Sequence, residues 1–370
     1  MSILNELNEF IPVSKPSITQ KEIDYVTKAV ESGWVSSLGK YIDRFEQEFA
    51  KYCGTEYAIS TSNGTNALHL ALVGLGIKKD DEVIIPDLTF IATANSVKYT
   101  GAKVITVDIQ QDTLCIDPIK IEEAITPNTK AIIPVHLYGH PAEMDKIKEI
   151  SAKHNLIIIE DAAEAHGAKI NGEKVGSLGD VGVFSFYGNK IITSGEGGMI
   201  TTSNKKLYHR LKDLRDHAMD KNKRYWHNEV GYNYRMTNLQ AALGLAQFER
   251  IDQFINKRIQ IMHWYEEGLK NIQGIKLNYQ ASWAKNVYWQ GCIEIDGYTE
   301  IMRNKLCGNL KAKNIDSRPY FYPISDMPMY PSTETPIAHK LYKEGLNLPT
   351  FYDLSELEVE VICQTLKDIL

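Results

Sequence analysis

Short apolar segments alternate with helix-forming segments between Tyr57 and Thr202, and this alternation restricts the possible fold more than any other feature of the chain. The apolar segments, which we predict to be strands, are residues 57–60, 82–86, 103–108, 131–135, 156–160, 181–186 and 199–202. The helices predicted between them are residues 67–73, 92–99, 118–125 and 142–154. Strands that alternate with helices build a mostly parallel sheet covered on both faces. The sequence therefore predicts an α/β protein.

The segment before this alternation predicts a helical arm. A helix is expected at residues 19–32, because Thr19 can cap it with Glu22 three positions later. Ile23, Val26 and Val30 mark one apolar face of this helix. A second helix is expected at residues 41–52.

The segment after the alternation predicts a second, smaller domain. The helices expected there are residues 206–213, 239 to about 269, 299–311 and 355–370, with a strand at 287–295. The long helix from Leu239 would bridge the two parts. We therefore expect a large domain at residues 1–250, which includes the helical arm, and a small α+β domain at residues 251–370.

Composition excludes several classes of protein. The 370 residues are 43% hydrophobic and 24% charged, which is ordinary for a globular protein. A net charge of -6 without a basic tract argues against a nucleic-acid partner. The first ten residues carry no basic segment of a signal peptide, and no apolar run is long enough to span a membrane. Five scattered cysteines fit reduced thiols. We expect a cytoplasmic protein with no membrane contact.

Lys190 is the first candidate for chemistry. It lies between two predicted strands, in a polar loop that glycines 195, 197 and 198 follow. Glycines allow other atoms to approach the backbone closely, and a lysine held between strands suits a nucleophile that forms a Schiff base. The alternative is an ordinary solvated lysine, which is the usual state of this residue.

A second candidate is a cradle for an anion. Strand 57–60 leads through Gly64 and Thr65 into a helix, and the free amide groups of a helix start attract anions. Ser185 has a buried hydroxyl that needs a partner, which a phosphate oxygen could be. An ordinary capped helix, and a bond from Ser185 to a neighbouring carbonyl, are the alternatives.

Asp161 closes the apolar strand 156–160 and is the third candidate. A carboxylate at the end of a buried strand needs a cationic or hydrogen-bonding partner, such as the ring nitrogen of pyridoxal phosphate (PLP). Asp161 could instead cap a helix at residues 162–165. Phe90 could cover a flat ring or belong to the core, and His166 could be a satisfied core histidine. His136 and His140 lack an evident third ligand, so we expect no metal site.

Taken together, these residues resemble the DegT/StrS family of PLP-dependent nucleotide-sugar aminotransferases, which have the aspartate aminotransferase-like (type I PLP) fold. The most specific segments are Ser62–Thr65, Glu160–Gly167, Phe184–Gly198 and Gly231–Asn238. Segments 186–190, 224–227 and 318–330 resemble the branch that aminates C4 of GDP-4-keto-6-deoxymannose. Ser325 is a departure, since the resemblance leads us to expect His there.

The resemblance implies a role for each candidate. Lys190 would form the Schiff base and move the proton, and Asp161 would keep the ring nitrogen protonated. The other cofactor-binding residues would be Gly64, Thr65, Phe90, Glu164, Ser185 and Asn233, with Asn233 reaching the cofactor of a neighbouring subunit. A homodimer with shared active sites follows. His217, Arg224, Trp226 and Arg318 would line the nucleotide-sugar cleft.

The resemblance also implies the reaction. The amino group of L-glutamate would pass through pyridoxamine phosphate to the C4 ketone of the sugar. The alternatives are a dTDP- or UDP-linked substrate, amination at C3, or a PLP- or sugar-binding sensor without turnover. A family relative that carries out 3-dehydration has His in place of the lysine, so Lys190 argues against dehydration.

Overall fold

A seven-stranded sheet forms the centre of the computed structural model, which describes residues 9–370. The prediction that no signal peptide is present concerns residues 1–10, most of which lie outside the described residues. The strand order is β1 (Tyr57–Thr61), β9 (Gly198–Thr202), β8 (Val181–Ser185), β5 (Ile157–Asp161), β4 (Thr129–Ile132), β2 (Glu82–Pro86) and β3 (Lys103–Val107). The five strands from β8 to β3 are parallel, while β9 runs antiparallel to both β1 and β8. The predicted α/β class is confirmed.

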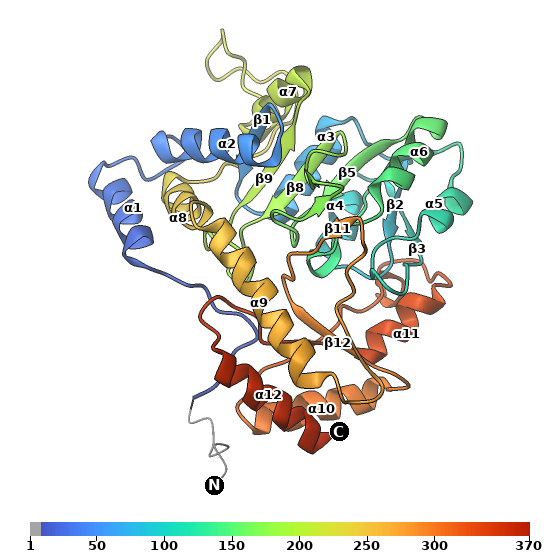
Figure 1. The fold of residues 1–370 in the computed structure, drawn as a ribbon. Coiled ribbons are helices and arrows are strands. Elements are labelled where there is room, and N and C mark those ends of the chain that lie inside the picture. The colour runs from blue at the N-terminus through green and yellow to red at the C-terminus, as the bar shows by residue number, and fades with distance from the viewer. Residues whose placement is uncertain (1–8) are drawn as a thin grey trace.

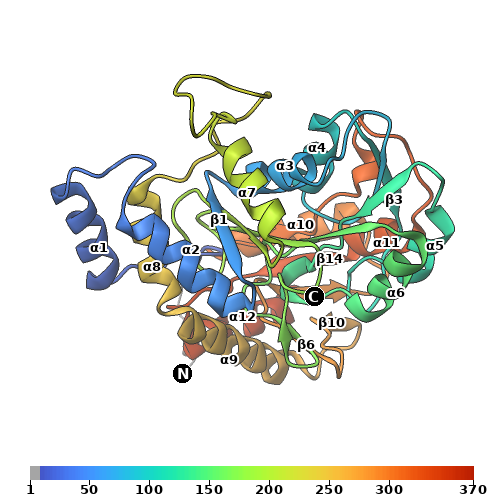
Figure 2. The ribbon, with the colours of Figure 1, turned by 90° about the horizontal axis from the view of Figure 1, so that it is seen from above.

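Helices cover both faces of this sheet (Figures 1 and 2). Because side chains alternate along a strand, Val83 and Ile85 of β2 enter one apolar core and Ile84 enters the other. Helices α3 (Gly64–Gly74), α4 (Ala92–Tyr99) and α7 (Lys205–Arg215) pack on the first core, and α2 (Lys40–Cys53), α5 (Pro118–Ala124) and α6 (Met144–His154) pack on the second.

The arm helix α1 (Gln20–Glu31) begins as predicted, with a capping box between Thr19 and Glu22. It packs against α8 (Asn238–Phe248) through Glu22 and Ala29, which are buried. Ile23 and Val30 of the predicted apolar face are instead 50% and 54% exposed. Within a single chain these two side chains therefore contact solvent, while Val26 of the same predicted face packs against the core.

The long helix predicted from Leu239 to Leu269 is wrong in one respect. Two helices, α8 and α9 (Ile251–Leu269), are separated at Glu249 and Arg250. The Arg250 guanidinium donates to Glu22 Oε1 at 2.8 Å and to the Ser17 carbonyl at 3.2 Å. No proline or glycine marks the break in the sequence, so the apolar spacing alone could not reveal it.

The C-terminal part contains a four-stranded antiparallel sheet of order β10 (Ile275–Leu277), β12 (Gly291–Ile295), β14 (Gly345–Leu348) and β13 (Arg318–Pro319). Helices α10 (Glu300–Ala312), α11 (Pro336–Glu344) and α12 (Glu356–Ile369) accompany it, below the large sheet in Figure 1. The predicted strand 287–295 was too long, because Val287 and Trp289 donate instead to the carbonyls of Gly139 and Tyr138. A domain boundary at residue 250 stays a prediction.

The remaining elements are short. A small sheet of order β11 (Ala284–Lys285), β6 (Lys169–Ile170) and β7 (Glu173–Lys174) connects the two parts of the chain, and η1 (Leu137–Gly139) and η2 (Ile324–Asp326) are single 3-10 turns. In residues 9–370, no helix is long and apolar enough to cross a membrane.

Candidate active site

Lys190 lies at the carboxyl edge of the large sheet, in the loop after β8. Its Nζ is 3.3 Å from Glu164 Oε1 and 3.8 Å from the centre of the Trp289 ring. The side chain is 11% exposed, which does not match an ordinary solvated lysine. The Trp289 indole also donates to the Asn189 carbonyl at 2.7 Å, which fixes the loop beside the lysine. This placement suits a nucleophilic amine.

Asp161 is the last residue of β5 and is buried. Its Oδ2 accepts a hydrogen bond from Thr93 at 2.8 Å, and its Oδ1 accepts one from the Ala163 amide at 3.2 Å. Residues 162–165 form turns, so the helix that Asp161 might have capped is not present. Burial raises the pKa of Asp161, while these hydrogen bonds and the charge of Lys190 oppose the rise. A cationic partner would stabilise the ionised carboxylate further.

Glu164 is the carboxylate that contacts the lysine amine. It is 3% exposed, and its second oxygen accepts a hydrogen bond from the Tyr138 amide at 2.9 Å. Burial raises the pKa of Glu164, and the charge of Lys190 opposes this rise. The same carboxylate therefore fixes η1 and orients the amine.

His166 is buried beside Phe184 and Phe186, with ring centres 5.4 and 5.6 Å away. Among the described residues, neither of its ring nitrogens has a hydrogen-bond partner. Burial lowers the pKa of His166 to about 3, and the charge of Lys190 acts in the same direction. His166 is therefore neutral near pH 7.

The residues of the predicted anion cradle lie next to each other, at the start of α3 and the end of β8. Asn63 caps α3 by accepting from the Asn66 amide at 2.8 Å, which leaves the Gly64 and Thr65 amides ahead of the first helical acceptor. A Cβ at Gly64 would lie 2.9 Å from the Cβ of Ser185, so only glycine lets the helix start approach this hydroxyl. Ser185 accepts a hydrogen bond from the Tyr187 amide at 3.4 Å. Amide and hydroxyl groups gathered at a helix start suit a phosphate.

Phe90 lies in the loop between β2 and α4, three residues before the Thr93 that binds Asp161. Its ring is 53% exposed, so it is not a core residue within this chain. One side contacts Phe321 at a centroid distance of 5.6 Å, and Phe321 stacks on Tyr138. Phe321 thus packs against one side of the Phe90 ring, while the ring remains partly exposed.

The structure does not bring all four predicted sugar-binding residues together in one chain. His217, Arg224 and Trp226 lie in the exposed loop between α7 and α8, which projects beyond α7 in Figures 1 and 2. Arg318 begins β13 in the C-terminal part, where it is 62% exposed and 3.7 Å from Asp316. A cleft shared by all four would need more than a single chain.

Asn233 is exposed and accepts hydrogen bonds from Arg235 at 3.0 and 3.1 Å. It does not cap α8, because Thr237 and Gln240 form the capping box of that helix. The neighbouring Tyr234 carbonyl accepts from the Ser62 amide at 2.8 Å, so the Asn233 loop lies beside the segment that leads to the cradle.

Ser325 is buried, and both its amide and its hydroxyl donate to the Asp87 carboxylate, at 2.8 and 2.7 Å. Asp87 follows β2 directly, so Ser325 ties η2 to the sheet edge that carries Phe90. Its polar groups are therefore occupied within the protein.

Two residues of the site were missed by sequence reasoning. The sequence gives a weak indication for Thr93, because this hydroxyl residue lies in the first turn of the predicted helix that follows Phe90. The sequence gives no indication for Trp289, because this residue comes from the C-terminal part and contacts Lys190 only through the packing of the two parts.

These features define a PLP-dependent sugar aminotransferase. The chain belongs to the DegT/DnrJ/EryC1/StrS aminotransferase family, which it matches over residues 16–367. It is 46% identical to the GDP-perosamine synthase of Caulobacter vibrioides, over 97% of this chain and 98% of the relative. It is 37% identical to the dTDP-3-amino-3,4,6-trideoxy-alpha-D-glucose transaminase of Streptomyces venezuelae, over 84% and 82% of the two chains.

A solved structure gives the same result for the fold. The putative sugar aminotransferase Spr1654 from Streptococcus pneumoniae, in its PLP form, superposes with a TM-score of 0.93 and 28% identity, over 97% of this chain and 98% of that one. The predicted type I PLP fold and the PLP cofactor are thereby confirmed.

The residues at the sheet edge fit this cofactor. Lys190 offers an amine, Asp161 offers a buried carboxylate for the ring nitrogen, and α3 with Ser185 offers a cradle for the phosphate. When bound, PLP supplies a ring that accepts the electrons released at the substrate carbon.

Proposed function

We propose that this aminotransferase moves the amino group of L-glutamate to the C4 ketone of GDP-4-keto-6-deoxymannose, with GDP-perosamine as the product. The observation that carries the proposal is full-length similarity at 46% identity to a GDP-perosamine synthase, against 37% over a shorter span for the dTDP-sugar transaminase. We propose further that the product serves the synthesis of a surface polysaccharide, such as the O-antigen of lipopolysaccharide.

The chemistry of the proposal rests on three side chains. Lys190 would bind the cofactor through its amine and later carry a proton between two carbons, since this amine is largely buried at the sheet edge beside Glu164. Asp161 would hold a proton on the ring nitrogen by charge and hydrogen bonding. Glu164 would orient the amine, because it lies 3.3 Å from it.

Substrate selection would come from the exposed arginines. Arg224 and Arg318 carry the permanent charge that a diphosphate needs, and guanidinium groups bind phosphates with two parallel hydrogen bonds. His217 and Trp226 would complete the cleft by hydrogen bonding and by stacking on the base.

We also propose that the active sites are shared in a homodimer. Large apolar side chains cluster on α1 and the segment after it: Ile23, Val30, Trp34, Val35 and Leu38 are each at least 41% exposed. Asn238 accepts and donates hydrogen bonds in this segment, including one to the Trp34 carbonyl at 2.7 Å. The apolar surface is thus attached to the loop that carries Asn233, and such a patch favours a protein partner.

The test follows the cofactor's visible absorbance and the mass of the product. L-Glutamate should remove the band of the PLP form, GDP-4-keto-6-deoxymannose should restore it, and an amino sugar should form. If glutamate removes the band but no amino sugar appears, the GDP substrate is wrong, and dTDP- and UDP-linked ketosugars are then compared at equal concentration. Bound PLP with no response to glutamate would instead indicate a sensor.

A further inference from the structure

Arg258 on α9 is buried, and two of its guanidinium nitrogens have no partner among the described residues. The residue is 3% exposed, and within residues 9–370 no hydrogen bond or ion pair involves its Nε or Nη1. A buried guanidinium with unpaired N–H groups is strongly destabilising unless something accepts those hydrogen bonds. Burial lowers the pKa of Arg258 to about 10, so the group remains charged near pH 7.

The guanidinium lines a small cavity on the inner side of the lysine loop. The wall comes from three parts of the chain: Lys15, Pro16 and Ser17 of the N-terminal arm; Lys190, Ile191 and Thr193 of the lysine loop; and Gln247, Phe254, Arg258 and Tyr352 of α8, α9 and the C-terminal part. The space is about the size of one water molecule.

The charges around this cavity have one sign. Three cationic residues line it, of which Lys190 already pairs with Glu164, and its lining contains no carboxylate. The nearby carboxylates already have partners: Glu22 accepts from Gln247 and Arg250, each at 2.8 Å, and Asp353 accepts from Ser17 at 3.2 Å. A neutral water could accept from Arg258, but it would leave the positive charge uncompensated.

We propose that this cavity binds a small monovalent anion of the halide class, held by the N–H groups of Arg258. Chloride is the physiological anion with this charge and nearly this size. It would join the N-terminal arm, the lysine loop and α9, because each of them contributes to the wall. The site is separate from the phosphate cradle at α3, so it does not depend on the identity of the sugar substrate.

Bromide is the probe, because it replaces chloride and scatters X-rays anomalously. Crystals of the PLP-bound enzyme grown in sodium bromide should show an anomalous peak within hydrogen-bonding distance of Arg258. In solution, chloride or bromide should raise Tm by about 2–4 °C over gluconate at equal ionic strength. Arg258→Met should abolish this difference between anions.

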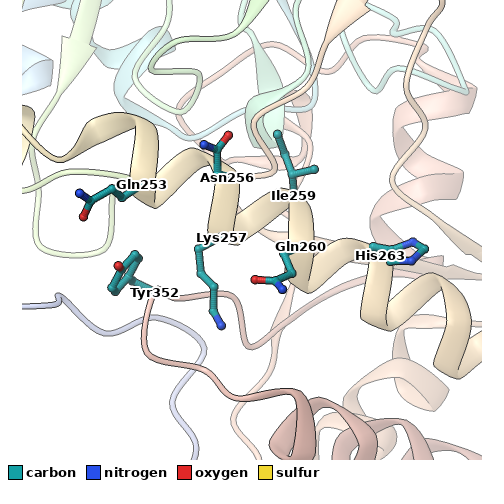
Figure 3. Close-up of a pocket in the computed structure, with 7 residues that line it drawn as sticks. All are labelled: Gln253, Asn256, Lys257, Ile259, Gln260, His263 and Tyr352. Carbon is teal, nitrogen blue, oxygen red and sulfur yellow. The ribbon is translucent and has the colours of Figure 1, made fainter.

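Lys257→Met is the matched control. Lys257 is the next residue of α9, but it lines another pocket, with Gln253, Gln260 and His263, that shares only Tyr352 with the Arg258 cavity (Figure 3). This variant should keep the anion-specific shift. An ordered water without a bromide peak, or equal Tm values in chloride and gluconate, would overturn the proposal. If Arg258→Met does not fold, the presence or absence of the bromide peak in wild-type crystals still tests the proposal.

Discussion

The sheet edge around Lys190 and the loop between α7 and α8 differ in how their candidate residues are held. At the edge, Asp161 and Glu164 are almost fully buried and each accepts hydrogen bonds from fixed neighbours. In the loop, Arg224 and Trp226 are exposed, and the Trp226 indole donates to Asn228 of the same loop. On our proposal the buried residues would set the type of reaction, while the exposed residues would set the choice of sugar.

The largest effect is expected at Lys190. Lys190→Ala should lower turnover by at least about 10⁴-fold, because the amine would serve both as the nucleophile and as the carrier of the proton. The matched control is Lys174→Ala, which removes a partly buried lysine that also lies over an aromatic ring, at 3.3 Å from Tyr52. Steady-state rates compare the two. Near wild-type turnover in Lys190→Ala would contradict the assignment.

Asp161→Asn should have the next largest effect, a fall in kcat of about 10²–10³-fold, since the amide cannot keep the ring nitrogen protonated. Thr93→Val, which removes one hydrogen bond to Asp161, should lower kcat less. Asp180→Asn is the control, because Asp180 accepts from the Ile158 amide near the other end of β5. Equal losses in Asp161→Asn and Asp180→Asn would indicate a purely structural role.

Substitutions of the exposed arginines should weaken the binding of the sugar substrate without changing the reaction with glutamate. Arg224→Ala and Arg318→Ala should each raise KM for the GDP-sugar by about 10–100-fold, the worth of a hydrogen bond to a charged group. The reaction with glutamate, followed by the loss of the visible band, should be unchanged. Lys221→Ala in the same loop is the control, since Lys221 pairs with Asp213 at 3.1 Å. If Arg224→Ala or Arg318→Ala weakened the reaction with glutamate to the same extent, these arginines would not act on the sugar substrate alone.

The smallest effect concerns pH and stability. Burial lowers the pKa of His166 to about 3 from an ordinary 6.5. Between these values the unfolded chain binds a proton that the folded chain does not, so stability is full above pH 6.5 and falls as the pH decreases. His166 should therefore cost about 2 kcal/mol of stability between pH 6.5 and pH 5.

Denaturant unfolding of His166→Gln and the wild type at both pH values measures this loss. The stability gap between them should shift in favour of the variant at pH 5. His227→Gln, in the exposed loop, should give curves parallel to the wild type. A constant gap for His166→Gln would show that the histidine is not held in its neutral form.

Much of the site could be predicted because it is local in the chain. Lys190 is marked by the glycines that follow it, and Asp161 by the apolar strand that it ends. Trp289 could not be found in the same way, because it reaches Lys190 only through the packing of the C-terminal part. The break between α8 and α9 was missed for a similar reason, since Arg250 is drawn to Glu22, which is distant in sequence.

The sequence by itself determined the alternation of strands and helices in the large sheet, the capping of α1 and the chemistry available at the sheet edge, because these depend on neighbouring residues and on regular apolar spacing. Tertiary structure alone decided that Ile23 and Val30 face solvent, that Trp289 covers the lysine, and that two nitrogens of the buried Arg258 have no partner in residues 9–370. Burial depends on contacts between segments that are far apart in the chain, and a single residue pattern does not specify which segments will meet.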